Sequence, residues 1–333
     1  MTSTNAPIPT ALDGLDGRDA AIVRVSTPPA LATRWQLVAG FLVIYLVWGS
    51  TYLAIRWGVA TIPPFGMGAA RFLLAGVSLF VWCRVRGAEK PTKAQWKASA
   101  IIGAMLLFVG NGAVSWASQR VSSGLTSVLV ATVPLWLVLC ELWQGIRPDV
   151  VKVIGVLIGL GGVAMLVMPT GGATATVDPL GAVVLAIGSL SWTIGSLYSR
   201  SARQAPSPAL AIAMQMLVGG SLLLLLSLVV GEWSTMPHVS LRSAASLLYL
   251  IVFGSLIGFS TYMWLLRVAS PAAVGTYAYV NPAVAVLLGV VLGGERLPAQ
   301  AVAAMSVIIG GVAMVSLAGG RAQRLITALR RSR

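Results

Sequence analysis

Aromatic and uncharged polar residues stand inside long apolar runs of this 333-residue chain, and parts of the sequence recur at one fixed spacing. Trp48 and Arg56 in the first half return as Trp192 and Arg200, each 144 positions later. Aromatic faces attract ammonium groups, and an uncharged polar wall suits a zwitterion, a neutral metabolite or an organic cation better than a phosphate. The chemistry that these residues predict is therefore the binding of a small molecule. We expect eight residues to line the cavity: Trp48, Thr51, Asn111, Trp116, Trp192, Tyr262, Tyr279 and Asn281.

Three further residues are expected to control access to this cavity or to shape it. Arg71 either caps carbonyls or extends to the outer surface, or it guides a carboxylate through an outer gate. Pro134 and Pro282 take matching places in the fourth and ninth runs, where each marks a hinge or binding point, or only a kink. Asn111 and Asn281 also leave two interpretations, because a buried amide serves either a ligand or an interhelical hydrogen bond.

A helical membrane scaffold must position these side chains. The chain is 57% hydrophobic and only 10% charged, whereas soluble domains are roughly one-quarter charged. Ten apolar runs each approach the roughly 20 residues that a helix needs to cross hydrocarbon, and they lack the alternation of membrane strands. The predicted fold class is an all-α polytopic membrane protein. The runs are Leu37–Ile55, Phe65–Trp82, Ala98–Trp116, Gly124–Cys140, Val150–Met168, Leu180–Tyr198, Ala209–Val230, Ala244–Leu266, Ala272–Leu292 and Ala299–Leu317.

The ten runs form two copies of one five-helix unit. The likeness returns near the end of each half, where Gly161–Met165 is answered by Gly310–Met314. Because five crossings are an odd number, the copies must enter the membrane from opposite faces, as inverted repeats do. We expect a disordered cytoplasmic tail (1–34), a first repeat (35–168), a periplasmic linker (169–177), a second repeat (178–318) and a basic cytoplasmic tail (319–333).

The cations predict the orientation of the chain. With a cytoplasmic N-terminus, eighteen Lys and Arg residues fall on the inner side, and only Arg56, Arg120, Arg242 and Arg296 fall on the outer side. This positive-inside bias places both termini in the cytoplasm. The net charge of +14 therefore indicates contact with anionic lipid, since the charges are scattered over short loops instead of forming a nucleic-acid-binding face.

Catalytic and metal-binding chemistry find no support in the sequence. The single histidine, His238, falls in a loop, and the two cysteines, Cys83 and Cys140, are expected to be ordinary apolar fillers. We therefore expect no metal, no cofactor and no enzyme activity. A stripe of Gly155, Gly159 and Gly162 favours close helix packing in a monomer, with a dimer interface as the alternative.

Several motifs, in this order and spacing, resemble the EamA family of the drug/metabolite transporter superfamily, particularly its YedA-like branch. They are Trp48–Tyr52, Pro63–Leu73, Val130–Pro134, Ser191–Ser196, and Tyr277–Pro282 followed by Gly293–Glu295. The resemblance implies ten helices, an inner-membrane location and the export of amino acids and related metabolites. In the similar YddG-type exporters, a central cavity between the halves takes the substrate. Glu295 is expected to be an end-of-helix charge that pairs with Arg296 or a neighbouring loop, and its first-half counterpart falls near Arg147.

The functional hypothesis is an inner-membrane carrier that exports amino acids or related zwitterionic or neutral metabolites by alternating access. All nine carboxylates lie in loops or at helix ends, whereas proton-driven carriers usually titrate a group inside the membrane. Facilitated movement down a gradient is therefore the simpler mechanism. The alternative in the same class is an exporter of cationic or aromatic drugs driven by an ion gradient. The alternatives from other classes are a membrane-embedded enzyme and a channel.

Overall fold

The computed structural model describes residues 33–143, 145, 148–167, 178–235, 238–269, 271–296 and 298–331. Within these ranges, the side chains of 166–167, 235, 271–272, 279 and 316–331 are not described. Almost all of the predicted N-terminal tail, the whole predicted linker 169–177 and Arg147 therefore lie outside the described residues.

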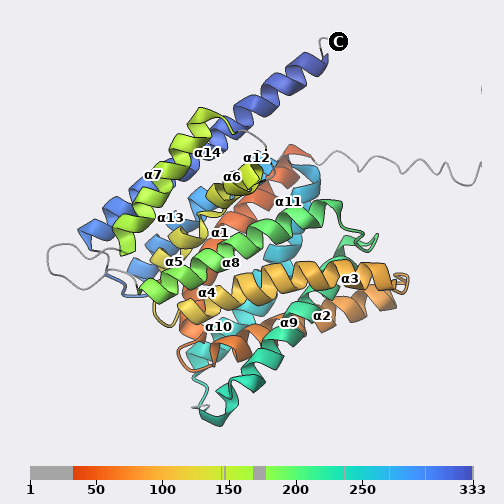
Figure 1. Ribbon diagram of the computed structural model, residues 1–333. Coiled ribbons are helices and arrows are strands. Elements are labelled where there is room, and N and C mark those ends of the chain that lie inside the picture. The colour runs from red at the N-terminus through yellow and green to blue at the C-terminus, as the bar shows by residue number, and fades with distance from the viewer. Residues whose placement is uncertain are drawn as a thin grey trace, which may run out of the picture.

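Every regular element in the described ranges is a helix, so the predicted all-α fold class is confirmed (Figure 1). Seven helices in the described ranges are long and apolar enough to span a membrane, and three shorter apolar helices accompany them there. The first half contains α1 (Arg34–Gly58), α2 (Pro64–Val85), α3 (Lys93–Ile102) continued by η1 (Gly103–Asn111) and α4 (Gly112–Ala117), α5 (Ser123–Val130), α6 (Val133–Trp143) and α7 (Val150–Val167). The second half contains α8 (Pro179–Ser201), α9 (Pro208–Val229), η2 (Glu232–Thr235), α10 (Leu241–Tyr249) continued by η3 (Leu250–Phe259) and α11 (Ser260–Val268), α12 (Pro271–Val274), α13 (Tyr277–Val291) and α14 (Ala299–Arg331).

The two halves pack against each other through equivalent helices, and the first helix of each half packs into the other half. The second helix of each half, α2 and α9, lie against each other, and so do the fifth helices, α7 and α14 (Figure 1). The first helix of one half likewise contacts the third and fourth helices of the other: α1 contacts η3 and α13, while α8 contacts η1, α5 and α6. These reciprocal contacts are the pattern that two inverted five-helix repeats produce.

Glycines bring α7 and α14 into backbone contact. A Cβ atom placed on Gly155 would lie 2.9 Å from the carbonyl oxygen of Gly311, and one placed on Gly311 would lie 2.6 Å from that of Gly155. No larger residue fits at either position without moving the helices apart. The close packing predicted from the glycine stripe is thus confirmed within one chain.

Large apolar side chains face outward around the bundle. Leu157, Leu225 and Leu287 are 65%, 59% and 62% exposed, on three different helices. The surface of a soluble protein rarely exposes large apolar side chains on so many sides, because water solvates them poorly. Lipid tails are as apolar as these side chains, so contact with hydrocarbon carries no such cost. The exposed surface is therefore suited to contact with lipid.

The third and eighth membrane helices each contain a π-helical segment, η1 and η3, that the sequence did not predict. A π-helical turn bonds i to i+5 and therefore carries more residues per turn than an α-helix, and such turns are frequent at functional sites. The two segments occupy equivalent places in the two halves. Both contribute to the wall of the central cavity.

Pro134 and Pro282 differ in their local structure. Pro134 is the second residue of α6, directly after a break at Ala131 and Thr132 that separates α5 from α6. The first turn of a helix tolerates proline, because its N–H groups have no intrahelical partner. Pro282 instead lies inside α13, which continues through it, while the break in that helix falls earlier, at Gly275. The two prolines therefore do not mark equivalent interruptions, and their hinge role stays a prediction.

Candidate functional site

A cavity lies between the two halves, with walls from both. The cavity volume, counted as the space that the centre of a water molecule can occupy, is about 70 Å³. This is several times the volume that one water molecule needs by the same measure. Four of the eight residues predicted to line a cavity border it: Trp48, Thr51, Asn111 and Trp192. Arg71 borders it as well. Of these residues, Trp48 and Trp192 are the pair that the sequence repeat relates.

An aromatic cluster forms one side of the cavity. The rings of Trp48 and Trp192, the two repeat equivalents, meet edge to face with their centroids 5.9 Å apart. Tyr262 lies 4.8 Å from the Trp48 ring, and Tyr277 lies 5.5 Å from it. A Cβ atom on Gly258 would lie 2.7 Å from Trp48 Nε1, so this glycine provides the space for the indole. The cluster therefore joins both halves through rings that prefer this edge-to-face arrangement.

Arg71 lies inside the cavity wall, not at the membrane surface. Its side chain is buried, and its Nε donates a hydrogen bond to Ser255 Oγ at 2.8 Å. Its guanidinium carbon stands 4.8 Å from the ring centroid of Phe72, and a Cβ atom on Gly254 would lie 2.9 Å from Nη2. The interpretation in which Arg71 extends to the outer surface does not fit this burial. A role in gating stays a prediction.

Three predicted lining residues are not brought to the cavity. Trp116 borders a separate hollow beside Ile62 and Glu232, where Arg120 stands 3.9 Å above its ring. Asn281 is buried in α13 without bordering the cavity, and its Oδ1 has no hydrogen-bond partner among the described residues. Tyr262 lies behind Trp48 as part of the aromatic cluster. The side chain of Tyr279 lies outside the described residues.

Small residues of the cavity wall were not identified from the sequence. Four of them border the cavity: Gly110, Gly188, Gly254 and Ser189. Ser189 Oγ is buried and has no hydrogen-bond partner in the part of the chain that the structure describes. A glycine or serine within an apolar run usually indicates close helix packing, so its type alone gave no signal. Gly110 and Gly254 do fall in the two π-helical segments, which the sequence did not reveal either.

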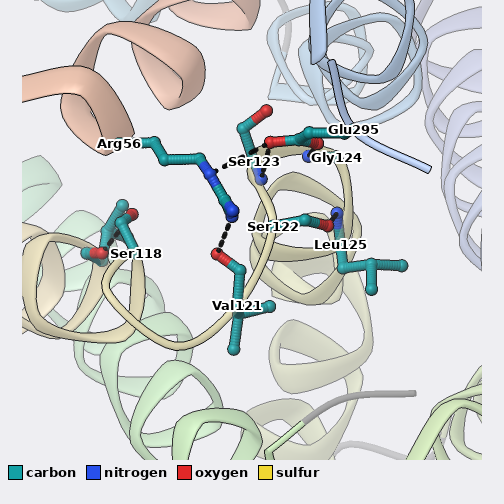
Figure 2. A network of polar contacts seen from close by, with 9 residues as sticks. Arg56, Ser118, Val121, Ser122, Ser123, Gly124, Leu125 and Glu295 are labelled. Atoms are coloured by element: carbon teal, nitrogen blue, oxygen red, sulfur yellow. Dashed lines mark hydrogen bonds and ion pairs between the residues drawn. The ribbon is translucent and has the colours of Figure 1, made fainter. Parts of the chain in front are cut away.

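At one end of the bundle, the carboxylate of Glu295 in the second half binds residues of the first half (Figure 2). Glu295, from the segment after α13, accepts hydrogen bonds from the backbone N–H groups of Ser123 at 2.8 Å and Gly124 at 3.3 Å. Arg56 Nε lies 3.5 Å from Glu295 Oε1, and Arg56 Nη1 donates to the carbonyl oxygen of Val121 at 3.1 Å. Glu295 therefore pairs with Arg56 instead of Arg296, because α1 and α13 run side by side and bring their ends together.

A second carboxylate caps a first-half helix in the same way. Glu232 accepts hydrogen bonds from the N–H groups of Phe65 at 3.2 Å and Gly66 at 2.9 Å, in the first turn of α2. Ser227 Oγ donates to the same carboxylate at 2.5 Å. Because helix N-termini carry unpaired N–H groups and partial positive charge, each carboxylate links the halves where such a helix begins.

Comparison with known proteins identifies the family. The model of the EamA-like transporter family matches residues 35–168 and again residues 179–317, which coincide with the two five-helix halves. The chain is 41% identical over 283 residues to the uncharacterized inner membrane transporter YedA of Escherichia coli K12, covering 84% of this chain and 90% of YedA. It is 25% identical to a probable terminal-alkyne amino-acid exporter of Streptantibioticus cattleyicolor, covering 85% and 92%. A crystal structure with 23% identity shares the fold at a TM-score of 0.60, covering 87% and 99%. The chain therefore belongs to the EamA-like transporter family.

Proposed function

We propose that this transporter resides in the inner membrane and exports amino acids or related zwitterionic or neutral metabolites by alternating access. The observation that carries the proposal is the contact between Trp48 and Trp192 at the wall of the central cavity. Equivalent residues of two inverted repeats meet only near the axis that relates the repeats. A binding site on that axis is reached from either face when one half rocks against the other.

The comparisons support the location and the substrate class. One relative with 41% identity is named an inner membrane transporter, and another is named a probable amino-acid exporter. The bias of eighteen cations against four supports cytoplasmic termini, with the Glu295 end of the bundle facing the periplasm. The cavity wall contains no carboxylate within the described residues, which supports facilitated transport over proton-coupled transport.

Counterflow in proteoliposomes tests the proposal. Vesicles that contain the purified protein are loaded with an unlabelled amino acid, and the uptake of the same labelled compound is followed. We expect saturable counterflow, a large loss on Trp48→Ala, and little loss on Trp116→Ala, because Trp116 lies outside the cavity. Absence of counterflow for every amino acid, or equal effects of the two variants, would contradict the proposal.

Two further measurements test mechanism and orientation. Flux that collapses when the pH gradient is dissipated at a clamped membrane potential would overturn facilitated transport. Single cysteines introduced near each terminus, in a background that lacks Cys83 and Cys140, report on the orientation. Labelling of either terminus from the periplasmic side would overturn the assignment of both termini to the cytoplasm.

A further inference from the structure

We propose that Arg71 is the counter-charge for a carboxylate of the transported substrate, so that this transporter selects small carboxylates and rejects neutral or purely cationic analogues. This inference rests on the proposed function, and it narrows the substrate class of the same cavity. It assigns to Arg71 a place in the binding site instead of a place in a peripheral gate.

Arg71 is a buried charge that has no acidic partner among the described residues. Its side chain is 6% exposed, and it forms no ion pair with any described residue. The hydrogen bond from Nε to Ser255 Oγ engages one of its five N–H groups, and Nη1 and Nη2 have no partner in the described part of the chain. An unpaired ion in a low-dielectric interior is strongly disfavoured, because it has lost its hydration without gaining a counter-charge. Such a residue persists when a ligand supplies the missing charge.

Residues of η3 and α2 fix the position of the Arg71 guanidinium. Ser255 holds Nε, and the missing side chain of Gly254 leaves room for Nη2, where a Cβ atom would come within 2.9 Å. Both residues belong to the π-helical segment η3. The guanidinium carbon lies over the ring of Phe72, 4.8 Å from its centroid. These contacts leave the two terminal nitrogens, Nη1 and Nη2, for the two parallel hydrogen bonds that a guanidinium makes to a carboxylate.

The rest of the cavity wall suits the remainder of a small amphiphilic acid. Ser189 borders the same cavity, and its Oγ has no hydrogen-bond partner among the described residues. The side chain of Asn111 makes one long hydrogen bond, 3.4 Å from Nδ2 to the carbonyl oxygen of Leu106, and no other within the described part of the chain. Trp48 and Trp192 border the cavity too, and aromatic faces attract an ammonium group. One guanidinium balances one negative charge, so a single carboxylate fits better than a phosphate, which carries more charge.

Matched pairs of probes test this inference on the full-length protein. Alanine, threonine and phenylalanine are each compared with their carboxamides, which keep the size and the ammonium group but lose the negative charge. Binding is measured as the ligand-dependent rise in melting temperature, and transport as counterflow in proteoliposomes. We expect at least one free amino acid to bind about 10- to 100-fold more tightly than its amide, the difference that charged hydrogen bonds supply.

Substitutions at Arg71 separate recognition from a structural role. Arg71→Gln should abolish the preference for the carboxylate, and Arg71→Lys should retain part of it because the charge remains. Arg71→Gln should also leave the melting temperature of the empty protein unchanged or higher, because it removes an unpaired buried charge. A structural arginine would give the opposite result, a lower melting temperature with the preference intact.

The outcomes distinguish this inference from the proposed function. Equal binding and counterflow of amino acids and amides by the wild type would overturn the role of Arg71 and leave amino-acid-like transport standing. Failure of every amino acid and amide to bind or exchange would overturn the proposed substrate class and this inference together. Retention of the carboxylate preference in Arg71→Gln would overturn the inference alone.

Discussion

Replacing Glu295 with glutamine should destabilise the fold through the start of α5. The carboxylate accepts two backbone N–H groups, those of Ser123 and Gly124, and its side chain is 4% exposed. Glutamine keeps one acceptor oxygen, but it turns an NH₂ group toward the second N–H. The substitution therefore removes about one charge-assisted hydrogen bond, worth about 1.5–3 kcal/mol, and a helix-terminus interaction of about 0.3–1 kcal/mol.

The expected loss for Glu295→Gln is thus about 2–4 kcal/mol in the free energy of unfolding. Arg56 should contribute little to it, because its side chain is 41% exposed and exposed ion pairs stabilise weakly. Unfolding in mixed micelles by a graded increase of denaturing detergent measures the difference. Arg56→Gln, made separately, should lower the free energy of unfolding by less than Glu295→Gln.

Glu141 supplies the matched control. It pairs with Lys152 at 2.7 Å, its side chain is 34% exposed, and it accepts no backbone N–H group in the described ranges. Glu141→Gln should therefore change the free energy of unfolding by no more than about 1 kcal/mol. Equal losses for Glu295→Gln and Glu141→Gln would refute the capping argument, and a larger loss for Arg56→Gln would assign the stability to the ion pair.

Three other substitutions should have separable effects. Gly155→Val should lower the free energy of unfolding by about 1–3 kcal/mol, since its Cβ would meet a carbonyl of α14 at 2.9 Å, whereas Gly161→Val, with open space around it, should not. Gly254→Ala should weaken carboxylate binding about tenfold, measured by thermal shift, because the methyl group displaces Nη2 of Arg71; an unchanged affinity would count against that geometry. Glu232→Gln should reduce stability about as much as Glu295→Gln, because each carboxylate caps a helix; a silent change in detergent unfolding would contradict this.

The sequence predicts the helices and the pairing of Trp48 with Trp192 because both depend on local or repeated features. Hydropathy alone identifies ten apolar runs, and the 144-residue spacing alone pairs Trp48 with Trp192. The depth of a residue follows from its place along a run, but its rotation about the helix axis does not. Asn281 and Trp116 were expected in the cavity wall, yet neither borders the cavity, and Trp116 borders a separate hollow.

Long-range pairing and π-helical turns could not be predicted in this way. A uniformly apolar run has no polar face whose periodicity would reveal a change from i+4 to i+5 bonding, so η1 and η3 left no pattern. Glu295 and Ser123 are separated by 172 residues, and only the packing of α13 beside α5 brings them together. Arg71 shows the same limit, because its burial depends on where η3 crosses α2.

The buried charge on Arg71 also bears on how closure depends on substrate. When the cavity is empty, closing it removes water from an unpaired guanidinium, which disfavours the closed form. A bound carboxylate supplies the missing charge, so closure around a loaded site costs less than closure around an empty one. A ligand shifts a conformational equilibrium only through such a difference in affinity between the two states. Arg71 would therefore both select the substrate and make the change between the inward-open and outward-open forms depend on bound substrate. Exchange of substrate across the membrane should then be faster than net transport, which requires the empty carrier to change form.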